Sequence, residues 1–391
     1  MRGVVVAGIG QTVFGKFLDT NVRSLAEEAL QLAVSDAAID PERIEIVYFA
    51  NALSGLITGQ ETIRGQVALR HTGLMGKPIV NVDNACASGS SAFQLAWLSV
   101  ASGQVDVALA IGAEKLTHPD KSVTFAAYAS GVDVEERERA MRATPDNRSI
   151  FMDIYAQRTR RYMDRSGATP EDFALVTVKS RHAASLSPWA QFKTETTQRE
   201  VLESRMVSAP LTLPMCSPIA DGAAAAVLVS EDVAKSLKTP PVRVRATAAV
   251  SANRDGAEPV VAARAAERAY AAAGLGPRDI HVAELHDASA SAEIMLYEHL
   301  GFAERNRGVE LIREGVTSVG GALPVNPGGG LLSRGHPVGA TGIAQIVELT
   351  TQLRGAAGAR QRPGASVALA ECSGGQIGAD SATAAVTILA V

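Results

Sequence analysis

One cysteine in this chain has the context of a reactive nucleophile. Cys86 stands in the segment Asn-Ala-Cys-Ala-Ser-Gly (84–89), directly before a run of small and apolar residues that favours a helix. The start of a helix offers unpaired N–H groups and the positive end of its dipole, and both favour a thiolate over a thiol. A thiolate can attack a carbonyl carbon and hold the acyl group as a thioester. The pattern predicts a nucleophilic cysteine at a buried helix start.

The composition allows a large core around such a site and excludes several classes of protein. The chain has 391 residues, of which 47% are hydrophobic, and a net charge of −4. No basic run indicates nucleic-acid binding. Three scattered cysteines form neither a disulfide framework nor a metal-ligand spacing, so a reducing cytoplasm is expected and no metal. The longest uncharged stretch, 84–105, contains five serines and predicts a buried helix rather than a membrane span.

The chain repeats a pattern of helix, turn and strand. Apolar strands alternate with helices, which is typical of α/β proteins. The helices expected after residues 86 and 336 lack a polar face, so they must lie between two layers. Three pairs of segments match in the same order along the chain: 38–47 with 274–283, 86–89 with 336–339, and 107–110 with 367–370.

The repeat predicts two similar halves. The first covers residues 1–235 and the second residues 240–391, with a proline-containing joint at 238–241. A more charged segment at about 117–218 has no counterpart in the second half. We therefore expect it to be an inserted loop domain on the surface of the first half.

Three further motifs accompany the cysteine motif. They are Glu-Leu-His-Asp-Ala-Ser around His286, Arg-Gly-His-Pro-Val-Gly-Ala-Thr-Gly around His336, and Glu-Cys-Ser-Gly-Gly around Cys372. In these motifs and their order the whole chain resembles the thiolase family, most of all the sterol-carrier-protein type and the thiolase-like acetyl-CoA acetyltransferases. The resemblance implies a duplicated, layered α/β/α/β/α fold. It also implies an acyltransferase of lipid metabolism that cleaves 3-ketoacyl-CoA with CoA, or condenses two acyl-CoAs, through an acyl-Cys86 intermediate.

The residues fit the parts that this chemistry needs. His336 is the candidate base for the Cys86 thiol, because the repeat places it where the first half has Cys86. Cys372 is the candidate acid and base at the α-carbon. The resemblance implies two sites for a developing oxyanion: His336 with His286, and the backbone N–H groups of Cys86 and Gly374. It implies coenzyme A and acyl-CoA as substrates with no bound cofactor, and leaves the residues that contact CoA open.

The chain departs from the family pattern beside His286. Sterol-carrier-type thiolases usually have a cysteine at the place of Ala288 and a phenylalanine at the place of Ser289, and that cysteine is thought to supply the acid and base. Here Cys372 is present instead. The resemblance further implies a homodimer or tetramer, located in the cytoplasm and bound to neither membrane nor nucleic acid.

Two alternatives remain open at the level of sequence. The chain fits the thiolase-like subunit of a complex with a small zinc-ribbon/OB-fold protein, in which it performs acyl transfer or an aldol-type cleavage. Lyases of that group usually lose the nucleophile, so Cys86 favours acyl transfer. The other alternative is a non-catalytic protein that binds acyl-CoA or lipid in the same pocket.

Overall fold

The apolar runs of the sequence form one mixed sheet. The computed structural model describes residues 1–141, 149–253 and 260–391. Within this part of the chain, nine strands pair in the order β3-β2-β4-β7-β1-β8-β11-β10-β9. Their bounds are β1 Val4–Gln11, β2 Ile46–Ala50, β3 Ile79–Val82, β4 Val107–Glu114, β7 Gly222–Ser230, β8 Val242–Ser251, β9 Val282–Glu284, β10 Val367–Gly374 and β11 Thr383–Ala390.

The sheet has two parts with the same pairing pattern. In the first, β2 and β4 are parallel while β7 and β1 add antiparallel neighbours. In the second, β9 and β10 are parallel while β11 and β8 add antiparallel neighbours. Among the described strands, two paired residues, Val5 with Arg243 and Val6 with Val242, join the two parts of the sheet. The repeat in the sequence thus corresponds to a repeat in strand order.

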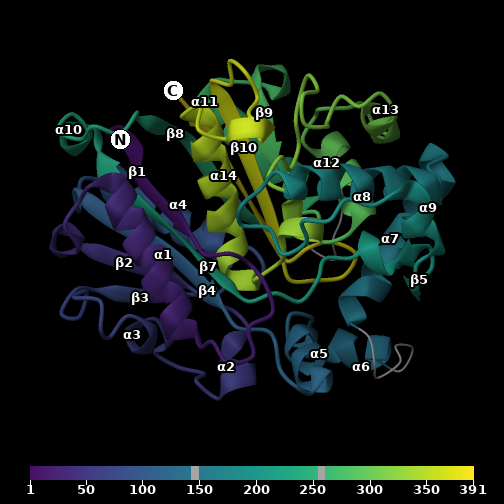
Figure 1. Ribbon diagram of the computed structural model, residues 1–391, viewed down its shortest axis with the longest axis horizontal. Coiled ribbons are helices and arrows are strands. Elements are labelled where there is room, and N and C mark those ends of the chain that lie inside the picture. Colours follow the sequence, from purple (N-terminus) through teal and green to yellow (C-terminus); the bar gives the residue numbers. More distant parts are fainter. Residues whose placement is uncertain (142–148, 254–259) are drawn as a thin grey trace.

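Two buried helices fill the space between the two parts of the sheet. They are α4 (Ser88–Ala101) and α14 (Thr341–Leu353), and one apolar cluster joins them to strands of both parts. Figure 1 shows α14 in the middle, with β4 and β7 on one side and β10 on the other. The helix starts touch: a Cβ on Gly342 would lie 2.2 Å from Ser90 Oγ. Glycine is needed at this close approach.

Helices on the outer faces complete the layers. Helix α1 (Val22–Ala37) buries an apolar stripe against the first part of the sheet, and α11 (Val261–Ala273) packs on β8 and β11. This arrangement confirms the predicted layered α/β/α/β/α fold. The remaining helices outside residues 117–218 are α2 Ser54–Thr58, α3 Arg64–Ala68, α10 Glu231–Ala234, α12 Ala290–His299 and α13 Gly308–Arg313.

Between β4 and β7 the chain leaves the large sheet. This segment packs on α12, where Thr159 Oγ1 lies 2.6 Å from Ser291 Oγ. Residues 142–148 of the segment lie outside the described residues. None of the described helices is long and apolar enough to cross a membrane. The elements of this segment are α5 Lys121–Ala129, α6 Val134–Met141, α7 Ile150–Ser166, α8 Pro170–Ser185, α9 Gln198–Glu203, β5 Met206–Ser208 and β6 Leu211–Thr212.

Candidate active site

Cys86 lies on a tight turn between β3 and α4. The turn is closed by a hydrogen bond from Ala87 N to Asn84 O (3.0 Å), and Ala85 adopts a left-handed conformation with φ of 49°. A non-glycine residue in that region is strained, and such strain concentrates at functional sites. The helix itself begins at Ser88, two residues after the cysteine. Cys86 is half-buried, and its side chain reaches the main cavity of the molecule.

His336 meets this cysteine from the other half of the fold. Its Nε2 lies 3.2 Å from Cys86 Sγ. Its Nδ1 lies 2.8 Å from the hydroxyl oxygen of Thr341, and that hydroxyl donates to Pro337 O at 2.9 Å. Because the Thr341 proton is used in this second bond, the hydroxyl oxygen accepts from Nδ1–H. The network therefore assigns the proton to Nδ1 and leaves the lone pair of Nε2 facing the thiol.

Burial makes this pair neutral at rest. It raises the pKa of Cys86 to about 12, and the nearby Glu114 carboxylate adds to the rise. The pKa of His336 is held well below its ordinary value by burial, with His286 and Arg334 adding to the effect. The expectation of a thiolate at the helix start is therefore wrong for the resting site, because desolvation and the nearby carboxylates favour the neutral thiol. The thiol needs a base, and the neutral imidazole is in contact with it.

Cys372 and Gly374 reach the site from the end of β10. The Cys372 thiol is fully buried and donates to Cys86 O at 3.1 Å. Burial, with the neighbouring Glu371, raises its pKa well above the ordinary value, so it is also protonated at rest. A Cβ on Gly374 would lie 2.3 Å from Asn84 O. Glycine is required there for the strand end to approach the cysteine turn.

His286 follows β9 and completes the group. Its ring is 5.2 Å from that of His336 in an edge-on arrangement. Burial, together with the positive charge of Arg158, lowers the pKa of His286 to about 4, so the ring is neutral. Its Nε2 is buried and makes no hydrogen bond within the described structure. A buried polar atom without a partner is costly, and an oxygen atom of a substrate would satisfy it.

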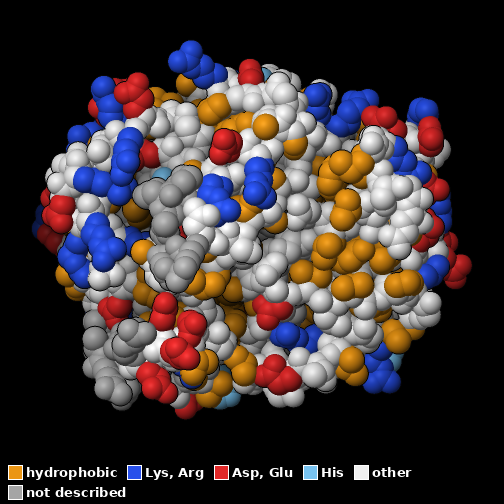
Figure 2. Space-filling view, turned by 180° about the vertical axis from the view of Figure 1, so that it is seen from behind, with side chains coloured by type: hydrophobic (Ala, Val, Ile, Leu, Met, Phe, Trp, Pro, Cys, Tyr) orange, Lys and Arg blue, Asp and Glu red, His pale blue; other side chains and the backbone are white. Residues whose placement is uncertain are grey.

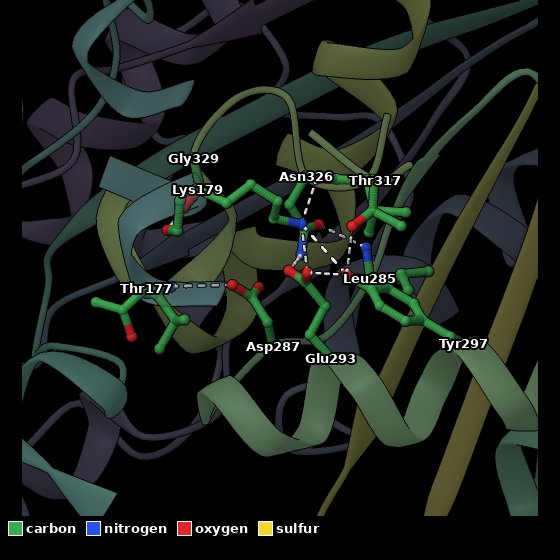
Figure 3. Close-up of polar contacts among 12 residues, drawn as sticks. Thr177, Lys179, Leu285, Asp287, Glu293, Tyr297, Thr317, Asn326 and Gly329 are labelled. Atoms are coloured by element: carbon green, nitrogen blue, oxygen red, sulfur yellow. Dashed lines mark hydrogen bonds and ion pairs between the residues drawn. The ribbon is translucent and has the colours of Figure 1, made fainter. Parts of the chain in front are cut away.

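A buried polar network fixes the backbone that carries His286. Asn326 accepts from Leu285 N (2.8 Å) and donates to Glu293 Oε2 (2.7 Å). Lys179 forms an ion pair with the same glutamate and donates to Val325 O at 2.9 Å. Figure 3 shows these side chains converging from α8, α12 and the loop that follows α13. A satisfied buried network of this kind holds one geometry.

A second carboxylate connects the loop after β2 with the loop that carries His336. Glu114, at the end of β4, accepts from Ala52 N (3.0 Å) and from Gly339 N (2.8 Å). The latter N–H belongs to the loop that carries His336. The sequence analysis did not identify Glu114, Asn326 or Thr341. Thr341 stands within the His336 motif, and its place after the histidine was the one sequence feature that could have pointed to its role.

A cavity of about 660 Å³ opens onto this group. Cys86, His286, His336 and Gly374 all line it, while aromatic and aliphatic side chains form most of the remaining wall. Its size and apolar wall are typical of small-molecule sites. Four cationic side chains also reach it: Lys16, Lys121, Arg181 and Arg205.

Three of these groups also have atoms that bind metals. The ligand atoms of Cys86, His286 and His336 lie within 4.8 Å of one another. Sulfur and imidazole nitrogen suit zinc. The contact between thiol and Nε2 gives the same atoms an acid–base role without a metal.

Comparison with known proteins shows which family this geometry belongs to. Residues 4–232 match the family model described as the thiolase N-terminal domain, and residues 244–390 match the one described as thiolase C-terminal domain-like. The acetyl-CoA acetyltransferase of Methanothermobacter thermautotrophicus is 39% identical over 99% of both chains. The benzoylsuccinyl-CoA thiolase subunit BbsB of Thauera aromatica is 38% identical over 96% of this chain and 95% of its own. Sterol carrier protein 2 of Gallus gallus is 37% identical over 94% of this chain and 69% of its own.

Solved structures show the same fold. The Ltp2-ChsH2(DUF35) aldolase superposes with a TM-score of 0.82 at 25% identity, over 100% of this chain and 98% of the other. Human mitochondrial 3-ketoacyl-CoA thiolase in complex with CoA superposes with a TM-score of 0.75 at 18% identity, over 100% and 98%. At that lower identity the likeness concerns the fold alone.

Proposed function

The chain belongs to the thiolase family and is an acyl-CoA acyltransferase, and from this premise we propose that it transfers acyl groups through Cys86. In one direction it would cleave a 3-ketoacyl-CoA with CoA, and in the other it would condense two acyl-CoAs. The observation that carries the proposal is the 3.2 Å contact between Cys86 Sγ and His336 Nε2, which joins a protonated thiol to a neutral base.

The first half of the reaction forms the acyl-enzyme. His336 takes the thiol proton as sulfur bonds to the 3-keto carbon. The bond between C2 and C3 then breaks, and its electron pair passes to the thioester enolate. Cys372 gives its proton to C2 and releases the shorter acyl-CoA. Its thiol lies 3.1 Å from Cys86 O, directly behind the nucleophile.

The second half returns the enzyme to its starting state. The Cys372 thiolate takes the proton of an incoming CoA thiol, whose sulfur attacks the acyl-Cys86 carbonyl. The bond from the carbonyl carbon to Cys86 breaks, and His336 returns its proton to the leaving sulfur. Every proton and electron pair is thereby restored.

Two sets of donors face the oxygens that gain negative charge. His286 and His336 are proposed to stabilise the thioester oxygen, and the unpartnered Nε2 of the neutral His286 supports this role. The backbone N–H groups of Cys86 and Gly374 are proposed for the oxygen of the carbonyl under attack. Each such donor is worth on the order of a hundredfold to a thousandfold in rate.

The lining of the cavity supports acyl-CoAs as the substrate class. Its apolar wall suits an acyl chain and the pantetheine arm of CoA. The four cations at the cavity are candidates for the CoA phosphates. We propose that residues 1–235 and 240–391 are two copies of one unit. Residues 117–218 are then an insert in the first copy, and this insert supplies three of the four cations.

Thiolysis of 3-ketoacyl-CoAs tests the proposal. We expect CoA-dependent loss of the 3-ketoacyl-CoA enolate absorbance, using short, long, branched and aromatic substrates. Cys86→Ala removes the nucleophile and is expected to lower kcat by at least about 10⁴-fold. Retained turnover in Cys86→Ala, or no turnover of any substrate by the wild-type chain with or without a partner protein, would contradict the proposal.

A second candidate function is the catalytic subunit of a hetero-complex. One sequence relative is named as a subunit, and one structural relative is an aldolase whose name joins two components. A small zinc-ribbon/OB-fold protein remains the candidate partner. Co-expression followed by size-exclusion chromatography tests this, because activity that appears only in a stable hetero-complex would favour it over an independent enzyme.

A homodimer is the proposed assembly of the chain. Val80 on β3 and Leu95 and Leu98 on α4 are exposed although apolar. Figure 2 shows apolar side chains gathered on the part of this face that lies over β2, β3 and α4. A contiguous exposed apolar area indicates an interaction surface. The cytoplasmic location stays a prediction.

A further inference from the structure

A second cavity adjoins the active-site cavity at His286. It has a volume of about 200 Å³ and shares Tyr155, His286, Ser373 and Ser381 with the main cavity. Such a volume equals that of about seven water molecules in the liquid. It is large enough for a short acyl chain or a substituent on one, and too small for the nucleotide of CoA.

The walls of this cavity differ in character. One wall is apolar and comes from Ala292, Met295 and Leu296, which share one face of α12. The opposite wall is cationic and comes from Arg158, Arg161 and Arg165 of α7. Spacings of three and four residues place these arginines on one helix face. At 1.5 Å per residue they span about 10 Å along the helix axis.

Arg158 is half-buried, and Arg161 and Arg165 are exposed. None of the three forms an ion pair with a carboxylate in the described part of the chain. Arg158 donates to two neutral oxygens, Gln376 Oε1 (2.8 Å) and Ala379 O (3.0 Å). Arg165 lies over the ring of Tyr162, 5.2 Å from its centre. Arg161 lines the cavity and makes no hydrogen bond or ion pair with any residue that the structure describes.

Among the residues that the structure describes, one acidic side chain lines this cavity, and it is already engaged. Asp380 is buried and accepts from Val261 N (2.6 Å) and Ser381 N (2.8 Å). Its charge therefore faces the start of α11. Among the described lining residues the arginines therefore outnumber the carboxylates by three to one, beside a space whose remaining wall is mostly apolar.

We infer that this second cavity binds a carboxylate carried by the acyl part of the substrate. The inference rests on the proposed function and narrows it to 3-ketoacyl-CoAs with an additional acidic group. Guanidinium matches a carboxylate with two parallel hydrogen bonds. The main cavity has its own four cations for the CoA phosphates, and the long pantetheine arm keeps those phosphates away from His286. The apolar α12 wall receives the carbon atoms that lead to the carboxylate.

Binding to the Cys86→Ala chain tests the inference without turnover. Calorimetry compares 3-ketoadipyl-CoA with its uncharged six-carbon counterpart, 3-ketohexanoyl-CoA. A second pair compares 2-carboxymethyl-3-ketobutyryl-CoA with its 2-ethyl counterpart, so that a carboxylate on the α-carbon is also covered. We expect the acid to bind at least about tenfold more tightly in one of the two pairs. Equal affinities in both pairs would overturn the inference.

Substitutions in the arginine wall test whether these arginines cause the preference for the acid. In the same background, Arg161→Gln or Arg165→Gln should remove most of the preference for the acid, and Arg161→Lys should keep part of it. Affinity for the neutral acyl-CoA should not change. Arg160→Gln is the matched control, because Arg160 is one residue away on the same helix and donates to Ala209 O instead. If Arg161→Gln weakened the acid, the neutral acyl-CoA and free CoA equally, the arginines would bind CoA phosphates and the inference would be wrong.

The two proposals fail differently. Thiolysis of neutral substrates without a preference for the acid in binding would leave the acyltransferase reaction standing and remove the carboxylate site. A preference for the acid that depends on Arg161, without thiolysis of any substrate, would support the carboxylate site and contradict the acyltransferase reaction.

Discussion

The two parts of the sheet present the same loop in the same place, with different chemistry on each. In the first part the chain runs through Cys86 into α4, and in the second it runs through His336 into α14. The two loops meet at a contact of 3.2 Å between sulfur and nitrogen. A duplicated frame thus brings two helix starts face to face, and the reaction needs a thiol on one and an imidazole on the other.

The strand ends beneath these loops differ for a steric reason. Gly112 of β4 matches Cys372 of β10 in the repeat. A Cβ on Gly112 would lie 2.2 Å from Gly339 O, so the first part has no room for a side chain there. Two residues further on, β4 has Glu114 and β10 has Gly374. The repeated strand order places matching residues at equivalent positions in the two parts. The packing of each loop on the opposite strand then decides which of these positions can carry a side chain.

After loss of the nucleophile itself, the largest effect is expected from removing the base on the loop of the second part. His336→Asn keeps a polar side chain but removes the base, and should lower kcat/KM for thiolysis by about a thousandfold. His71→Asn, at an exposed position away from the site, serves as the control. A loss of less than about tenfold in His336→Asn would mean that another group takes the thiol proton.

The pH dependence of Cys86 alkylation separates a neutral pair from an ion pair. Because burial raises the pKa of the thiol to about 12, the thiolate fraction grows about tenfold per pH unit below that value. The rate of reaction with iodoacetamide, followed by peptide mass spectrometry, should therefore rise about a hundredfold between pH 7 and 9. A rate that is already constant at pH 7 would indicate a resting thiolate–imidazolium pair.

A smaller effect should follow from removing the hydrogen bond that keeps the proton of His336 on Nδ1. Thr341→Val keeps the shape of the side chain and removes the oxygen that accepts from Nδ1. We expect kcat to fall by about tenfold, close to the energy of one hydrogen bond, with little change in KM. Thr341→Ser should restore most of the rate, because serine keeps the hydroxyl. Equal rates for valine and serine would show that Thr341 has no positioning role.

The smallest effect on turnover, but a clear one on stability, should come from Gly112. Gly112→Ala would drive a methyl group against Gly339 O and should reduce the free energy of unfolding by about 1–3 kcal/mol. Thermal unfolding measures the loss. Gly276→Ala is the control, because its Cβ would meet no atom closer than 3.9 Å and its φ is −132°. Equal melting temperatures for the two variants would contradict the close packing described between the two parts.

The sequence predicted the layers and the convergence of the motifs for identifiable reasons. Apolar strands, helices without a polar face and the repeated segments are local patterns, and the repeat itself implied that residues 86 and 336 face each other. The ionisation of Cys86 was not predictable in this way, because it depends on how deeply several distant elements bury the thiol. Glu114 and Asn326 were also missed. Each acts on a backbone N–H from a different segment, and no local pattern marks such a contact.

The second cavity illustrates the same limit. Arg158, Arg161 and Arg165 belong to the charged segment at 117–218 that we expected on the surface. Only the packing of α7 beside α12 and the loop at 376–381 shows that these arginines line a cavity next to the active site.

Mass spectrometry of the acyl-enzyme tests the central claim most directly. The wild-type chain is mixed with a 3-ketoacyl-CoA in the absence of free CoA, quenched in acid, and digested. We predict one acyl group per chain, on the peptide that contains residue 86, and its loss when CoA is added before the quench. An acyl group on Cys372 or Cys216 instead, or none on any peptide while thiolysis proceeds, would show that the contact between Cys86 and His336 is not the site of acyl transfer.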